Sequence, residues 1–129
     1  MFLPHKSDTG THQPWEWLPA AAGTYKVGQL LNVSGGQLVP VEGASATTPA
    51  YLCQADVTVD GGKTVPVQRV TGSYIYETQL SAAAEGAAIG SKLRVSAGGL
   101  QADAGAAGTF EIVEIEGTAA GATVRGRFK

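Results

Sequence analysis

One twelve-residue pattern occurs twice in this chain, and this repeat constrains the fold more than any other feature. Residues 27–38 (VGQLLNVSGGQL) align with residues 89–100 (IGSKLRVSAGGL) at a constant offset of 62, with six identical pairs. Each copy alternates apolar and polar residues and then enters a Ser-Gly-rich stretch, which is the pattern of a β-hairpin. Because self-similarity at a fixed offset indicates a repeated structural unit, we expect two similar halves.

Weaker similarity extends each copy into a larger unit. Residues 51–53 correspond to 110–112, and residues 64–65 to 123–124, both at an offset of 59. Each half, about residues 24–70 and 87–128, then offers a hairpin, an aromatic-led strand, a glycine-containing turn and a closing strand. The 18 glycines and the 16% of charged residues disfavour long helices. We therefore predict an all-β fold, a small barrel or sandwich of about eight to ten short strands, with at most one short helix at residues 81–85.

The first 22 residues differ in composition from the rest of the chain. They contain both tryptophans, both histidines and three prolines, and they show neither a helical nor a strand period. Such a segment is typical of an extended arm. At 129 residues the chain has the size of one domain, so we expect an extended N-terminal arm over residues 1–22 and a β-domain over residues 23–129.

The two tryptophans of the arm are the strongest candidates for a binding surface. Trp15 and Trp17 occupy alternate positions, so in an extended segment their rings face the same side. That side packs either on the protein's own barrel or on a partner subunit, where tryptophan is a favoured residue. Trp15 and Trp17, which stand between Pro14 and Leu18, are therefore the most unusual residues of the arm.

The histidines offer only a weak metal site. His5 and His12 can be combined with Asp8 as a trio of ligands, but the segment lacks a rigid element and a partner that would orient the imidazoles. A polar arm explains these residues better.

The sequence also lacks a nucleophile elbow and a Cys-His framework. We expect no enzyme activity, no cofactor and no metal.

The remaining reactive side chains also have structural interpretations. The carboxylate pairs Glu114/Glu116 and Asp56/Asp60 share strand faces, and for the mostly wet face of Asp56 and Asp60 solubility is the ordinary explanation. The single cysteine, Cys53, excludes an intramolecular disulfide. Cys53 lies in an expected strand over residues 51–59, in which alternate apolar residues face one way and Leu52, Gln54, Asp56, Thr58 and Asp60 face a mostly wet side. Its place on the apolar side predicts a buried structural thiol.

Charge and hydropathy exclude two further classes. The formal net charge is −2, and the nine Lys and Arg residues are mostly scattered, whereas nucleic-acid modules show a concentrated basic face. No apolar run approaches the length of a membrane span, and the N-terminus lacks a signal pattern. We expect a soluble protein made in the cytosol that binds neither nucleic acid nor membrane.

A proline-rich arm followed by a small Gly/Ala/Val-rich β-domain, with the segments 27–31 (VGQLL) and 89–93 (IGSKL), resembles the capsid decoration, or cement, proteins of tailed bacteriophages. The runs 29–40, 49–52 and 65–70 contribute most to a likeness that covers about residues 24–129. The resemblance implies a non-enzymatic protein on the virion surface, synthesised in the host cytoplasm. It would bind the major capsid protein on the outside of the expanded head, commonly as a homotrimer, through Pro14, Trp15, Trp17 and Leu18.

A second class stays open at this point. A β-sandwich that binds a ligand or carbohydrate, or an adhesion module of a phage fibre or cell-surface protein, would display exposed aromatic residues on a sheet. Tyr74 and Tyr76 are the same-face pair available for that role.

For the capsid hypothesis, we expect deletion of residues 1–22 to weaken binding and to leave the β-domain folded.

Overall fold

The structure, a computed structural model, describes residues 1–10, 12–105 and 107–129. Within these residues it contains no helix, and it contains thirteen strands: β1 (Leu3–Ser7), β2 (Trp15–Pro19), β3 (Gly23–Tyr25), β4 (Leu30–Ser34), β5 (Gln37–Pro40), β6 (Tyr51–Cys53), β7 (Val57–Val59), β8 (Thr64–Arg69), β9 (Tyr74–Gln79), β10 (Lys92–Val95), β11 (Ala102–Asp103), β12 (Phe110–Ile115) and β13 (Thr123–Phe128). The part of the chain that is described therefore has no helix that could span a membrane.

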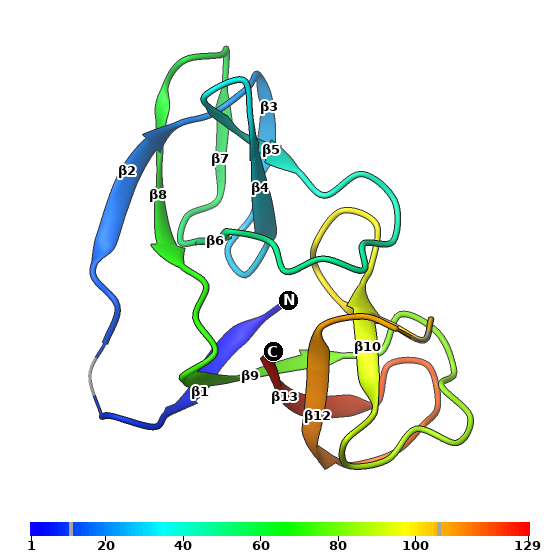
Figure 1. Cartoon of the computed structure of the whole chain (residues 1–129). Coiled ribbons are helices and arrows are strands. Elements are labelled where there is room, and N and C mark those ends of the chain that lie inside the picture. Colours follow the sequence, from blue (N-terminus) through cyan, green and yellow to red (C-terminus); the bar gives the residue numbers. More distant parts are fainter. Residues whose placement is uncertain (11, 106) are drawn as a thin grey trace.

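The strands form two curled sheets and one isolated pair. The first sheet has the order β2-β8-β6-β4-β5 and the second the order β1-β9-β13-β12-β10-β11, while β3 pairs with β7. Figure 1 shows the sheets as two lobes with both chain ends between them. The prediction of a small all-β barrel or sandwich is confirmed. The strands outnumber the expected eight to ten because the first 22 residues contribute two and because β3, β7 and β11 have only two or three residues each.

The second sheet reproduces the strand pairing of the first at the offsets seen in the sequence. β4 pairs with β6 and β6 with β8, just as β10 pairs with β12 and β12 with β13. The register pairs correspond one to one: Leu31↔Tyr51 with Leu93↔Phe110, and Tyr51↔Arg69 with Phe110↔Phe128. β2 lies beside β8 as β9 lies beside β13. The two halves are therefore similar in pairing and register, and β1 is an additional strand on the second.

Each sheet curls until two of its distant strands meet at one end: the residue after β2 meets β5 in the first sheet, and the residue after β9 meets β11 in the second. A parallel bridge joins Ala20 to Leu38 in the first half, and another joins Leu80 to Ala102 in the second. All four side chains are at most 1% exposed. The alanine comes first in the chain in one bridge and the leucine comes first in the other, so each closure contains one alanine and one leucine.

The hairpin turns of the two halves differ in length. In the first half, Ser34 pairs with Gln37 across Gly35 and Gly36, and both glycines have positive φ. In the second half, Val95 pairs with Ala102, so the turn is longer and contains Leu100. This turn contacts the first half, where the Gly99 carbonyl accepts a hydrogen bond of 2.8 Å from the Leu30 N–H. A Cβ atom on Gly99 would lie 2.3 Å from the Leu30 carbonyl oxygen, which explains the glycine.

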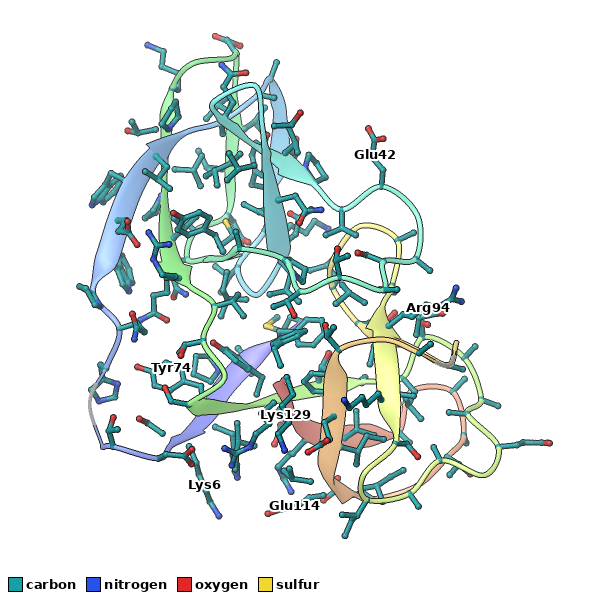
Figure 2. All side chains as sticks on the ribbon, viewed as in Figure 1. Lys6, Glu42, Tyr74, Arg94, Glu114 and Lys129 are labelled. Atoms are coloured by element: carbon teal, nitrogen blue, oxygen red, sulfur yellow. The ribbon has the colours of Figure 1, made fainter. Side chains whose placement is uncertain are left out.

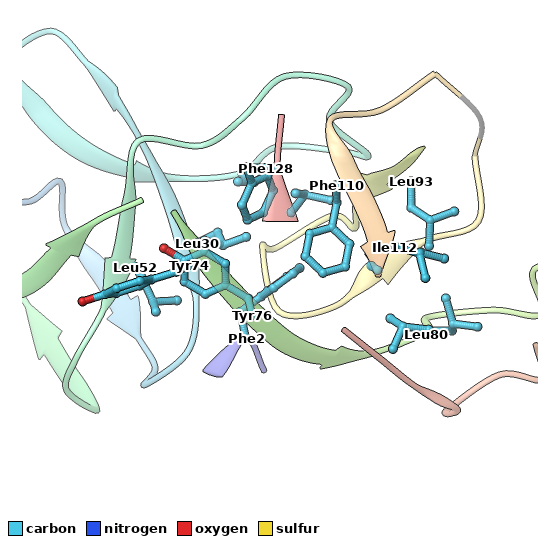
Figure 3. Packing of buried hydrophobic residues seen from close by; sticks show 14 of the residues in the cluster. Phe2, Leu30, Leu52, Tyr74, Tyr76, Leu80, Leu93, Phe110, Ile112 and Phe128 are labelled. Atoms are coloured by element: carbon cyan, nitrogen blue, oxygen red, sulfur yellow. The ribbon is translucent and has the colours of Figure 1, made fainter. Parts of the chain in front are cut away.

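Two apolar clusters form the core. The first half encloses a mainly aliphatic cluster that includes Leu31, Val65 and Val67. The second encloses an aromatic cluster, to which the first half also contributes Leu30 and Leu52 (Figure 3). Because side chains from both halves share this second cluster, the chain folds as one unit.

Phe2 explains why the N-terminal segment does not stand apart. Its ring is fully buried, 5.5 Å from the Phe110 ring centroid and 6.1 Å from that of Phe128. β1 then pairs with β9, and β2 pairs with β8. Residues 1–22 are thus largely extended, as expected, but they are parts of both sheets instead of a free arm. The physical reason is that one buried aromatic ring and two strand ladders hold the segment to its own subunit.

Candidate functional site

The four predicted contact residues lie on or next to β2, which is the terminal strand of the first sheet. Trp15 and Trp17 are 54% and 61% exposed, and Pro14 is also exposed. Leu18 points to the other face, where it is partly buried against the aliphatic core. The structure therefore places Pro14 and the two tryptophan rings on the surface and gives Leu18 a packing role.

The open side of β2 also presents main-chain hydrogen-bonding groups. Trp17 lies opposite Pro66 of β8. Pro66 has no N–H, and its carbonyl accepts a hydrogen bond of 2.9 Å from Gln54, on the side away from β2. Trp17 and Pro66 thus form a non-hydrogen-bonded pair, in which the N–H and C=O of Trp17 point away from β8.

The residues that follow β2 support the same alternation. The Ala20 N–H donates to the Lys63 carbonyl at 2.9 Å, on the side of β8. The next residue, Ala21, donates in the opposite direction, to the Leu38 carbonyl at 3.0 Å. Because main-chain groups alternate in direction along a strand, those of Trp15 also point to the open side.

Side-chain interactions hold β2 in place from its neighbours. The Glu16 carboxylate lies 3.5 Å from the Arg69 guanidinium, which donates to the Tyr51 hydroxyl at 3.0 Å and lies 5.2 Å from that ring's centroid. The Gln68 side-chain amide donates to the Gln13 carbonyl at 2.9 Å. An edge that is already ordered loses little conformational entropy on binding.

Two of the three residues considered as a metal trio have other partners. Asp8 forms an ion pair with Arg127 at 2.7 Å, and His5 lies 4.0 Å from Glu77. Across residues 1–10, 12–105 and 107–129, no group of three or more His, Cys, Asp or Glu side chains could hold a metal ion.

The carboxylates of β12 and the residue after it converge on one arginine instead of forming an acid-base pair. Arg125 lies 2.8 Å from Glu114, 2.8 Å from Glu77 and 4.0 Å from Glu116. The hydrogen bond from Arg125 lowers the pKa of Glu114. Figure 2 shows Glu114 at the surface, as it also shows Lys6 and Glu42. The three acids around Arg125 therefore form ion pairs that stabilise the second sheet.

Cys53 is fully buried, as predicted, and its thiol donates to the Ala55 carbonyl at 3.2 Å. Burial is the main cause that raises the pKa of this thiol. A thiol that is both inaccessible and protonated is a poor nucleophile.

An open groove of about 760 Å³ lies between the two halves. It is lined in part by Met1, Tyr25, Lys26, Asp56 and Leu100. The Asp56 carboxylate already accepts a hydrogen bond of 2.9 Å from the main chain of residue 27. The Thr24 and Thr58 hydroxyls of its lining lie 3.0 Å apart and are hydrogen-bonded to each other.

The tyrosines proposed as a sugar-binding platform are not available for that role. Tyr74 and Tyr76 are 4% and 1% exposed, and their rings lie in the aromatic core (Figure 3). Desolvation by burial raises the pKa of Tyr76 to about 12. The two side chains share a face, as expected, but this face is the buried one.

Comparison of the chain with protein-family models, with curated proteins and with solved structures found no match.

Proposed function

We propose that this protein is a non-enzymatic structural protein of a phage virion, which binds the major capsid protein on the outside of the capsid and stabilises the expanded head as a homotrimer. The observation that carries the proposal is the exposure of Trp15 and Trp17 on an ordered, open edge strand. The resemblance of the sequence to capsid decoration proteins supports the same conclusion.

The physical argument concerns the cost of exposed tryptophan. Large aromatic side chains on a surface are unfavourable in water and are enriched at the centres of protein interfaces. Two adjacent rings make only a small contact area. A small contact suffices for a cement protein because oligomeric binding to a repeating shell raises the overall affinity.

Co-sedimentation with expanded and unexpanded capsids of the same phage tests the proposal. We expect the full chain to bind expanded capsids only. The double variant Trp15→Ala/Trp17→Ala should bind at least about 30-fold more weakly, since even one hot-spot aromatic contributes about 2 kcal/mol or more. Ile89→Ala is the matched control, because Ile89 is 73% exposed and lies outside β2.

Deletion of residues 1–22 is no longer a suitable test. It would remove Phe2 from the core and two strands from the sheets, so we expect the truncated chain to unfold. Equal capsid binding by the double variant and by the intact protein would contradict the assigned contact. Absence of binding by the intact protein would contradict the function itself.

Carbohydrate binding is the second candidate, and the same tryptophans favour it. Rings at alternate positions of one strand face the same side and can stack on sugars. A glycan array that shows binding by the intact chain, lost in Trp15→Ala/Trp17→Ala, together with no capsid binding, would support this alternative.

A further inference from the structure

The similarity of the two halves assigns an equivalent to every position of the β2 edge. Leu80 and Ala20 occupy the same place in the two parallel bridges, which sets an offset of 60 between β2 and β9. Trp17 therefore corresponds to Glu77, and Trp15 to Ile75. Trp17 lies opposite Pro66 of β8, and Glu77 lies opposite Arg125 of β13, which is the residue that corresponds to Pro66.

The equivalent edge in the second half is covered. β1 runs antiparallel to β9, with Leu3 opposite Glu77 and Lys6 opposite Ile75. β1 is therefore the outermost strand of the second sheet, whereas β2 is itself outermost in the first. The same position of the same architecture is thus occupied by an extended strand in one half and open in the other.

We propose that the open edge of β2 receives an extended strand of the major capsid protein, which adds antiparallel to it as β1 adds to β9. Its main chain would bond to the outward N–H and C=O groups of Trp15 and Trp17, and its alternate side chains would pack against the two rings. This inference rests on the proposed capsid function and names the part of the partner that is bound.

The exposed area argues against a second copy of the chain as the occupant. Tryptophan side chains bury up to about 250 Å² each, so rings that are 54% and 61% exposed offer on the order of 300 Å² per protomer. A stable dimer needs roughly 800 Å² from each partner. In a symmetric dimer the two β2 strands would pair antiparallel. In the register that pairs Trp15 with Trp17 of the other copy, the two Glu16 residues would lie opposite each other. A strand of a shell protein brings no second Glu16, and because many copies bind one repeating shell, each contact can be smaller than a stable dimer needs.

A proline substitution isolates the main-chain part of this contact. Trp17→Pro removes the ring and the outward N–H, whereas Trp17→Ala removes the ring alone. Proline is tolerated in an edge strand where its N side faces solvent, so the free variant should stay folded, which a thermal melt checks. We expect Trp17→Pro to bind expanded capsids at least tenfold more weakly than Trp17→Ala.

Hydrogen exchange provides a readout that does not depend on a variant. In the complex of the intact chain with expanded capsids, the amide protons of Trp15 and Trp17 should exchange at least tenfold more slowly than in the free protein. Capsid binding without this protection, or with equal affinity of Trp17→Pro and Trp17→Ala, would overturn the strand-addition proposal and leave the capsid function standing. A Trp17→Pro-sensitive dimer of the free protein would overturn it in favour of self-pairing. No capsid binding by the intact chain would overturn the function and this inference together.

Discussion

The two halves of the molecule share one pattern of strand pairing and differ in what fills and closes it. The second half packs the rings of Phe110, Phe128 and Tyr76 around Phe2, and its outer edge is covered by β1. The first half packs mainly aliphatic side chains such as Leu31 and ends in the open strand β2. Turns and alternation therefore set the strand pairing, while the N-terminal segment decides which edge is open.

Removal of the Phe2 ring should have the largest effect on the free energy of unfolding. This ring belongs to the second core, and the first core has no counterpart to it. Phe2→Ala leaves a cavity among aromatic rings, and large-to-small changes of this kind cost about 3–5 kcal/mol. Urea unfolding measures the loss. Leu3→Ala is the control, since Leu3 is 41% exposed, and it should cost less than about 1 kcal/mol. Equal losses for both variants would mean that Phe2 does not anchor the N-terminus.

The parallel bridges allow one half to be rebuilt in the manner of the other. Leu38→Ala should destabilise by about 2–5 kcal/mol. Adding Ala20→Leu reproduces the Leu80 and Ala102 arrangement of the second half, and we expect the double variant to recover at least about 1 kcal/mol of the loss. A double variant that is less stable than Leu38→Ala alone would show that the two closures are not equivalent in shape. Urea unfolding of the single and double variants decides this.

A glycine distinguishes the two halves at one core position. Gly126 occupies the place of Val67, but a Cβ atom on Gly126 would lie 2.4 Å from the Glu111 carbonyl oxygen and 2.9 Å from the Phe110 ring. Gly126→Ala should therefore destabilise by about 1–3 kcal/mol. Gly117→Ala, whose Cβ would meet only Ala122 at 3.5 Å, is the control and should change thermal stability little. Similar melting temperatures for both variants would contradict the crowding argument.

The smallest expected effect concerns an ion pair that only the second half has. Arg94 and Asp103 lie 2.6 Å apart, where the first half has Asn32 and Val39. Burial alone would raise the pKa of Asp103, but hydrogen bonds from Arg94 and the Gly105 N–H outweigh it and lower the pKa. The stabilisation is therefore present above the unfolded-state pKa and is lost as the pH falls through the lower folded-state value.

Asp103→Asn should remove this pH dependence and cost up to about 1 kcal/mol at neutral pH, because the pair is partly exposed. Unfolding measured between pH 7 and pH 2 checks both points, with the exposed Asp60→Asn as control. If the Asp103→Asn protein loses as much stability on acidification as the intact protein, other carboxylates account for the acid response.

The repeat in the sequence predicted the all-β fold and the corresponding strands because it reports main-chain turns and alternation, which are local properties. It could not predict the length of the second hairpin turn. Leu100 aligns with Leu38, but it lies in the longer turn that contacts the main chain of Leu30. Contacts between the halves decide this turn, and no local pattern encodes them.

The expected strand over residues 51–59 shows the same limit. It divides into β6, which pairs with β8, and β7, which pairs with β3. Leu52 was expected on a wet face, yet it is 2% exposed because it packs into the core of the second half. The alternation of Trp15 and Trp17 is visible in the sequence, but the open edge beside them depends on where β1 binds, and only the assembled sheets show this.

Equivalent edges of the two halves differ in one respect: β9 is covered by β1, and β2 is open. Amide hydrogen exchange in the free protein, resolved by NMR, tests this difference most directly through Glu77 and its counterpart Trp17. We predict that the Glu77 amide proton exchanges at least about 100-fold more slowly than that of Trp17, because paired amides open only through local unfolding. Equal protection of the two amide protons would contradict the account.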